Sequence, residues 1–120
     1  MSKAPDGVRP FSWVADGVNA RLVKAASGYV YGFQVFHVAA APIYLKLYDQ
    51  ATLPVSTDVP VARFGIPLDA AAAAGSELNV QFPEPIRFEK GIGARLVTGI
   101  ADTNDVAVGA DTALVTLQRL

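Results

Sequence analysis

The sequence predicts an all-β domain: an antiparallel β-sandwich, jelly-roll-like, with about eight strands. Two observations predict it. First, short runs alternate apolar and polar residues, most clearly in 77–82, where Leu78, Val80 and Phe82 share one face. Second, turn-forming residues such as Gly, Pro, Asn and Asp separate these runs at short intervals. Eight antiparallel strands are the count of a jelly roll, and an immunoglobulin-like sandwich is the alternative architecture.

The predicted strands follow in chain order. They cover residues 19–26, 29–38, 43–49, 61–66, 77–82, 86–89, 92–100 and 112–120. The prolines Pro83 and Pro85 separate the fifth and sixth runs, because proline cannot donate a hydrogen bond to a neighbouring strand. Residues 69–75 include five alanines, too few for a stable isolated helix, and we expect a linker or a single helical turn there.

Two runs predict how their strands are covered. In 43–49, alternation places Ile43, Leu45 and Leu47 in the core and Tyr44, Lys46 and Tyr48 in an amphipathic outer row. In 29–38 both faces are apolar, with Tyr29, Tyr31, Phe33 and Val35 on one and Val30, Phe36 and Val38 on the other. Such a strand is either central and covered on both sides, or covered by another subunit.

The chain divides into an N-terminal arm, residues 1–17, and one β-sandwich domain, residues 18–120. The arm contains two prolines and two glycines and shows no sustained period. Phe11 and Trp13 lie in it, and large aromatic residues in an arm need a surface to dock on, either on this subunit or on a neighbour.

Composition restricts the class of function. The chain has 120 residues, one domain's length, with 52% hydrophobic and only 18% charged residues, where an average soluble domain has about 25% charged. A small protein with so little charge is expected to cover part of its apolar surface with a partner chain. The net charge of −1 and the absence of a basic run argue against nucleic-acid binding.

Other sequence features argue against export and membrane insertion. No apolar stretch reaches the length of a signal peptide or a membrane span, so we expect synthesis in the cytoplasm and no membrane partner. The chain has no cysteine and therefore no disulfide or thiol chemistry.

No residue pattern indicates catalysis, so we expect no enzyme and no cofactor or metal. His37, the single histidine, lies in the most apolar run and has no motif partner. Residues 102–105 with Asp111 contain oxygen ligands suited to Ca²⁺ but lack the spacing of a calcium loop, so a turn is the interpretation. Glu84 and Glu89 lack the cleft that a glycosidase pair needs. The tyrosines Tyr29, Tyr31, Tyr44 and Tyr48 suit either a subunit interface or a sugar-stacking platform.

Five segments resemble, in the same order, a group of small virion structural proteins of tailed bacteriophages and prophages. They are 29–36 (YVYGFQVF), 44–48 (YLKLY), 57–61 (TDVPV), 91–93 (GIG) and 98–104 (TGIADTN), and the resemblance spans residues 19–120. It implies a virion component, chiefly a capsid decoration (cement) protein on the outside of the head. It brings no catalytic residues.

The resemblance also implies partners and a location. The expected partners are other copies of the chain, as a homotrimer, and the major capsid protein or another virion protein; the expected location is the virion. The alternative is a tail or head-fibre component, or a carbohydrate- or receptor-binding module. The candidate interface residues are Phe11, Trp13, Tyr29, Tyr31, Phe33, Phe36, His37, Tyr44 and Tyr48.

Overall fold

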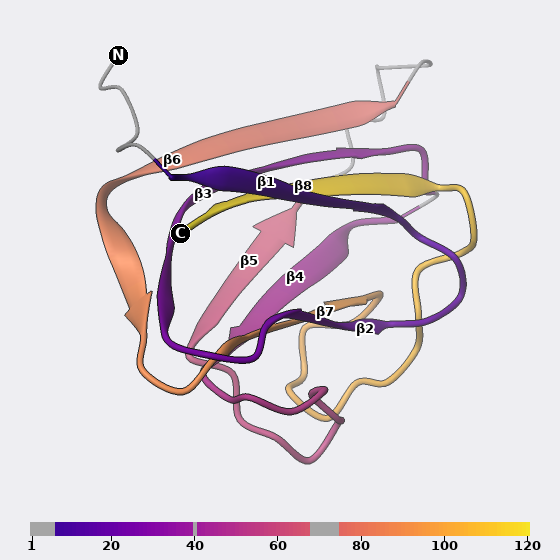
Figure 1. Cartoon of the computed structure of the whole chain (residues 1–120). Helices are drawn as coiled ribbons and strands as arrows, with labels where there is room; N and C mark the ends of the chain where they lie inside the picture. Colours follow the sequence, from indigo (N-terminus) through magenta and orange to yellow (C-terminus); the bar gives the residue numbers. More distant parts are fainter. Residues whose placement is uncertain (1–6, 40, 68–74) are drawn as a thin grey trace.

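The computed structural model describes residues 7–39, 41–67 and 75–120, and within these ranges the chain forms eight β-strands. Two four-stranded antiparallel sheets stack on one another, as Figure 1 shows. Sheet A has the order β1 (Arg9–Val14), β8 (Ala113–Arg119), β3 (Gly28–His37), β6 (Ser76–Phe88). Sheet B has the order β2 (Ala20–Lys24), β7 (Ile92–Val97), β4 (Ile43–Tyr48), β5 (Ala62–Ile66). The predicted all-β sandwich is confirmed.

The strands pair in a nested order, from the two ends of the sequence toward its middle. The first strand pairs with the eighth, the second with the seventh, the third with the sixth and the fourth with the fifth, all antiparallel. A long hairpin of four strand pairs wrapped into two sheets is the jelly-roll arrangement. The connections β1–β2, β3–β4, β5–β6 and β7–β8 therefore leave the sandwich at one end, and the other three leave at the opposite end.

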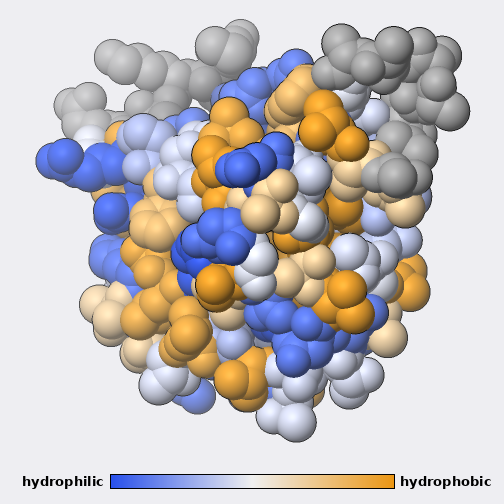
Figure 2. Space-filling model, turned by 90° about the vertical axis from the view of Figure 1, so that its right-hand side faces the viewer, coloured by the Kyte–Doolittle hydropathy of each residue, from blue (hydrophilic) through white to orange (hydrophobic). Residues whose placement is uncertain are grey.

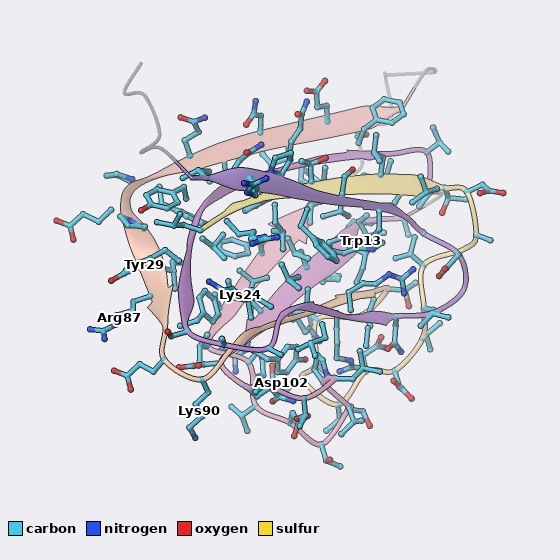
Figure 3. The ribbon with its side chains drawn as sticks, in the orientation of Figure 1. Trp13, Lys24, Tyr29, Arg87, Lys90 and Asp102 are labelled. Atoms are coloured by element: carbon cyan, nitrogen blue, oxygen red, sulfur yellow. The ribbon has the colours of Figure 1, made fainter. Side chains whose placement is uncertain are left out.

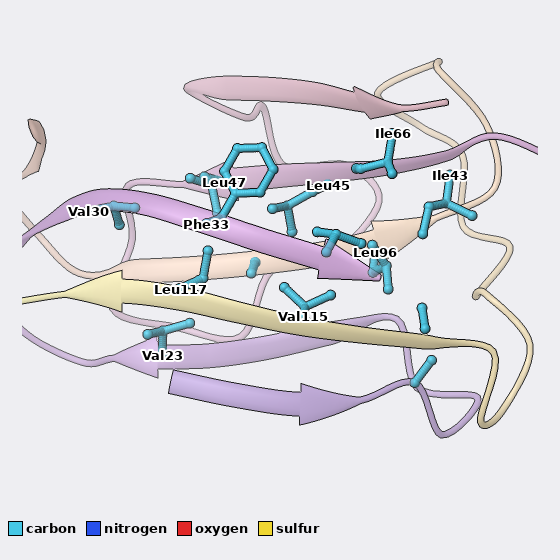
Figure 4. Packing of buried hydrophobic residues seen from close by; sticks show 14 of the residues in the cluster. Val23, Val30, Phe33, Ile43, Leu45, Leu47, Ile66, Leu96, Val115 and Leu117 are labelled. Carbon is cyan, nitrogen blue, oxygen red and sulfur yellow. The ribbon is translucent and has the colours of Figure 1, made fainter. Parts of the chain in front are cut away.

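The core fills the space between the two sheets, where apolar side chains of both inner faces meet (Figure 4). Phe33 of sheet A packs on Phe64 of sheet B, with ring centroids 4.7 Å apart. The predicted core residues Ile43, Leu45 and Leu47 are all buried. Each fully buried aliphatic side chain stabilises the fold by about 1.5–3 kcal/mol relative to an exposed one.

The expected irregular arm is wrong for residues 9–14, which form β1 and pair along their whole length with β8. Phe11 and Trp13 point toward the core and pack against each other edge to face, with ring centroids 5.8 Å apart. The alternation Phe11, Trp13 against Pro10, Ser12 and Val14 was the available signal, and two prolines nearby obscured it. Proline is compatible with β1 because β1 is an edge strand.

The predicted runs 77–82 and 86–89 form one strand, β6, at the edge of sheet A. Its pairing with β3 moves from Val30↔Ile86 to Gly32↔Gln81, so residues 82–85 have no partner in the register and Tyr31 lies in the irregularity. An edge strand tolerates prolines in such a bulge, because no ladder hydrogen bond is lost.

The same bulge corrects the predicted faces of the strand over 29–38. Because the register shifts between Val30 and Gly32, Val30 lies on the same inner face as Phe33 and Val35, and all three are buried. The strand is central in its sheet, since β3 lies between β8 and β6, but it is not covered on both sides, because Gln34 and Phe36 on its outer face are exposed. Gly32 is needed at the bulge, because a Cβ there would overlap the carbonyl oxygen of Val80.

Candidate functional site: the loop-end surface

Exposed apolar side chains gather on one surface of the molecule. Seven of the eleven exposed large hydrophobic residues among the described parts of the chain lie at or near the end where β1–β2, β3–β4 and β7–β8 connect. We call this the loop-end surface; its exposed apolar residues are Val14, Val18, Phe36, Val38, Ile100, Val106 and Leu114. The other four lie in the β4–β5 connection; they are Leu53, Val55, Val59 and Val61.

Figure 2 looks at the molecule from this end and shows hydrophobic side chains in several areas separated by hydrophilic ones. Three residues of the loop-end surface form a cross-strand row on the outer face of sheet A, because Val14 pairs with Leu114 and Leu114 pairs with Phe36. The β3–β4 and β7–β8 connections at this end also line an apolar pocket of about 280 Å³, formed by Ala39, Ala41, Pro42, Ile43, Thr98, Val108, Gly109 and Thr112. Apolar areas interspersed with polar groups also occur in protein–protein contact surfaces.

Backbone hydrogen bonds tie the three connections of this surface together. Ala15 donates to Ala113 (2.8 Å) and accepts from Asp111 (2.6 Å), which joins the β1–β2 connection to the start of β8. Val38 donates to Thr112 (2.8 Å), which joins the β3–β4 connection to the same segment. Asp111 itself has a positive φ of 61°, a backbone region that Asp adopts more readily than most residues. The surface is thus built on fixed backbone.

A row of three cations lies beneath the β7–β8 connection, on the outer face of sheet B. Lys46 is the cross-strand neighbour of both Arg63 and Arg95. Like charges in directly opposite positions destabilise a sheet unless anions or carbonyl groups compensate them. Lys46 and Arg95 are also almost completely buried. We call these three residues the cation row; the sequence pattern gave no sign of it, because the pairing register decides it.

Residues 101–105 compensate the cation row. Arg63 donates two hydrogen bonds to Asp102, Nε to Oδ1 at 2.6 Å and Nη2 to Oδ2 at 2.7 Å. Lys46 Nζ donates to the carbonyl oxygen of Ala101. The hydrogen bonds from Arg63 hold the pKa of Asp102 below its usual value, and burial beside Arg95 lowers the pKa of Lys46.

Arg95 is held from four directions. Its Nη2 donates at 2.7 Å to the carbonyl oxygen of Asn104 and at 2.7 Å to Oδ1 of Asp105. Its Nη1 lies 3.3 Å from the hydroxyl of Tyr48 and 3.3 Å from the carbonyl oxygen of Asp102. Residues 102–105, which the sequence analysis interpreted as a turn, therefore also serve as an anionic cover. Asp102 and Asp105 are paired with arginines, and no group of three or more His, Cys, Asp or Glu suited to a metal occurs in the described ranges.

The predicted outer row of 43–49 needs correction, because Lys46 and Tyr48 are buried under the connections. The β4–β5 connection also reaches this face: Pro54 lies against Gly93, where a Cβ would approach the proline ring to 3.0 Å. The physical reason is that both connections fold back over sheet B. Sheet A has no such cover on its outer face, where Ser12, Gln34 and Asn79 are exposed.

The structure places the nine candidate interface residues in three groups. Phe33, His37 and Tyr48 are buried, so the prediction that they contact a partner is wrong for them. His37 Nε2 lies 3.0 Å from the carbonyl oxygen of Pro67 and ties the β5–β6 connection to β3. Phe36 is 40% exposed and belongs to the loop-end surface. The remaining five, Phe11, Trp13, Tyr29, Tyr31 and Tyr44, are half-buried, and their role as contacts stays a prediction.

The four tyrosines do not form one platform. Tyr29 and Tyr31 belong to sheet A, with ring centroids 6.4 Å apart, whereas Tyr44 and Tyr48 belong to sheet B. The residues that sequence reasoning missed are the exposed valines and isoleucine of the connections. Single aliphatic residues in turn segments carry no periodic signal, so only their gathering in space reveals a surface.

Comparisons with known proteins give little further information. No protein-family model matches the chain, and no curated protein matches it. One solved structure that resembles it is the coat protein of tobacco streak virus, with a TM-score of 0.37 and 10% sequence identity; the match covers 98% of this chain and 89% of that one. Within the described residues, no helix has the length and apolar character needed to cross a membrane.

Proposed function

We propose that the chain is a non-enzymatic structural subunit of a virion: a capsid decoration protein that associates with its own copies as a homotrimer and binds the major capsid protein of a phage head. The loop-end surface carries this proposal. It combines exposed aliphatic side chains, an apolar pocket and a fixed backbone, which are the properties of a contact surface made for a protein partner. The sequence resemblance to phage virion proteins supports the same role.

The hydrogen bonds that the charged side chains of the cation row make within the fold support a structural role. Lys46 donates to the carbonyl oxygen of Ala101, while Arg63 pairs with Asp102 and Arg95 with Asp105, and these bonds hold the β7–β8 connection in place. The single histidine is likewise buried and bonded to a backbone carbonyl. These contacts stabilise the surface rather than leave reactive groups in a cleft, and a rigid surface loses less entropy when a partner binds.

The proposal is tested first by light scattering on the purified chain, and then by co-sedimentation with capsid heads of the phage or prophage that encodes it. A trimer, or pelleting with the heads, is expected. Val106→Asp in the loop-end surface is expected to reduce association at least tenfold, whereas Val59→Asp, at a more exposed valine in the β4–β5 connection, serves as the control. A monomer that also fails to pellet with the heads contradicts the proposal.

A further inference from the structure

The positively charged residues in the described parts of the chain fall into two groups. Four of them, Arg21, Lys46, Arg63 and Arg95, are hydrogen-bonded within the fold. The other five in the described ranges, Arg9, Lys24, Arg87, Lys90 and Arg119, make no ion pair there. All five lie at or next to strand termini at the end opposite the loop-end surface. Asp49 and Glu89 lie at the same end, so the unpaired positive charge is local to these side chains and does not extend over the whole end.

Two of these cations line a hollow of about 170 Å³ at the β2–β3 turn. Its lining residues are Lys24, Ser27, Gly28, Tyr29, Arg87, Phe88 and Leu120. Tyr29 and Arg87 are direct cross-strand neighbours on β3 and β6. Figure 3 shows both at the left edge of the molecule, with Lys24 farther inside. The backbone there is packed without spare room, since a Cβ on Gly28 would overlap the carbonyl oxygen of Leu120.

The chemistry of the lining restricts the ligand. Lys24 and Arg87 supply unpaired positive charge for an anionic group, and an arginine can hold a carboxylate or sulfate by two parallel hydrogen bonds. Tyr29 supplies an aromatic ring beside these cations, and Ser27 supplies a hydroxyl that both donates and accepts. The hollow is smaller than the roughly 300 Å³ of pockets for drug-sized ligands, so it suits a single residue of a chain.

We propose that this hollow binds an acidic sugar residue, a sugar ring that carries a carboxylate or sulfate. The ring lies against Tyr29, the anionic group contacts Lys24 and Arg87, and Ser27 hydrogen-bonds a ring hydroxyl. A bare anion would use the two cations but leave the aromatic ring unused, and a neutral sugar would leave the cations unpaired. The proposal does not use the loop-end surface, because the hollow lies at the other end of the sandwich.

The test is an NMR titration of the isotope-labelled chain with glucuronate, glucose 6-sulfate, glucose and N-acetylglutamate amide. At least one of the two acidic sugars is expected to shift the amide signals of Gly28, Tyr29 and Arg87, with half-saturation on the order of millimolar. Glucose and the glutamate derivative are expected to bind at least about fivefold more weakly, because each lacks one of the two interactions. The derivative represents the carboxylate of an acidic peptide.

Single substitutions in the lining test which side chains contact the acidic sugar. Arg87→Gln and Lys24→Gln are each expected to weaken binding of the acidic sugar about fivefold or more. Lys90→Gln and Arg9→Gln, which remove unpaired cations outside the lining, are the matched controls and are expected to change it less than twofold. Tyr29→Leu keeps an apolar side chain for the fold and is expected to lower affinity as well. Any of three results overturns the proposal: no shifts with either acidic sugar, equal binding of glucose, or equal binding of the glutamate derivative.

Discussion

Lys46 lies directly opposite Arg95 on the outer face of sheet B, and both side chains are buried. Two neighbouring buried cations are unfavourable by themselves, so the fold depends on the groups that cover them. Those groups all come from residues 101–105 and Tyr48. The cation row therefore links the stability of the sandwich to the conformation of the connection that carries part of the loop-end surface.

Arg95→Met is expected to lower the free energy of unfolding by about 2–4 kcal/mol, since it leaves two partly buried carbonyl oxygens and the buried Tyr48 hydroxyl without their donor. Chemical denaturation monitored by tryptophan fluorescence measures the change. Arg21→Met breaks the more exposed pair with Asp16 and is the control, with an expected loss below about 1 kcal/mol. An equal decrease in the free energy of unfolding of the two variants would show that the hydrogen bonds over Arg95 stabilise the fold no more than an exposed ion pair does.

Stability is expected to fall in acid partly through Asp102. Its pKa is lowered in the folded chain by the hydrogen bonds from Arg63, so the folded state binds this proton less readily than the unfolded state. The contribution is therefore complete above the ordinary value of 3.8 and is lost as the pH falls through the lower folded value. Asp102→Asn should flatten the pH dependence of the midpoint of thermal unfolding below about pH 5. Asp111→Asn, at an exposed position with positive φ, is the control and should leave the curve parallel to that of the unchanged chain.

Trp13→Ala is expected to lower the stability of the single subunit by about 2–4 kcal/mol, because Trp13 packs on Phe11 and on the core. The arm interpretation predicts the opposite balance, with weaker assembly and unchanged folding. Urea unfolding at protein concentrations where only monomer is present separates the two. A decrease in the free energy of unfolding below about 0.5 kcal/mol would contradict the core role of Trp13 and favour its role in docking on a partner.

Gly32→Ala is expected to destabilise the fold by about 2 kcal/mol or more, because the added Cβ overlaps the backbone of Val80 at the bulge. Gly109→Ala is the matched control: its Cβ would meet the Thr112 side chain at an ordinary 3.6 Å. Thermal unfolding followed by circular dichroism compares the two. If both variants unfold at the same temperature, the close approach of β3 and β6 at the bulge is not required.

The fold could be predicted from the sequence to the level of class and strand count, because alternation and turn residues are local signals. Eight strands were predicted and eight are present, but the membership differs: Arg9–Val14 was missed, and two predicted runs form the single strand Ser76–Phe88. Both differences involve prolines in edge strands. A proline disrupts a strand only where a neighbouring strand would accept a hydrogen bond from the missing N–H group. Sequence alone does not say which strands lie at an edge.

The candidate surface was predicted less well, because burial of a single side chain depends on what folds over it. Tyr48 and Lys46 alternate correctly with the core residues of β4, yet two distant connections bury them. Phe33 changes its neighbours when the register shifts at Gly32. Conversely, Val18, Ile100 and Val106 belong to separate turns and become one surface only in three dimensions.

The nested pairing has a consequence for synthesis on the ribosome. Ser12 and Thr116, whose hydroxyls lie 3.1 Å apart, are separated by 104 positions in the chain. Strand β8 fills the gap between β1 and β3, so sheet A stays divided, with unpaired backbone along the facing sides of both strands, until residues 113–119 have emerged. Contacts this distant slow folding, and open edges invite pairing with other chains. Newly made copies therefore pass through a stage in which crowding favours misassembly, and a chaperone that covers the open edges would raise the yield of native subunits.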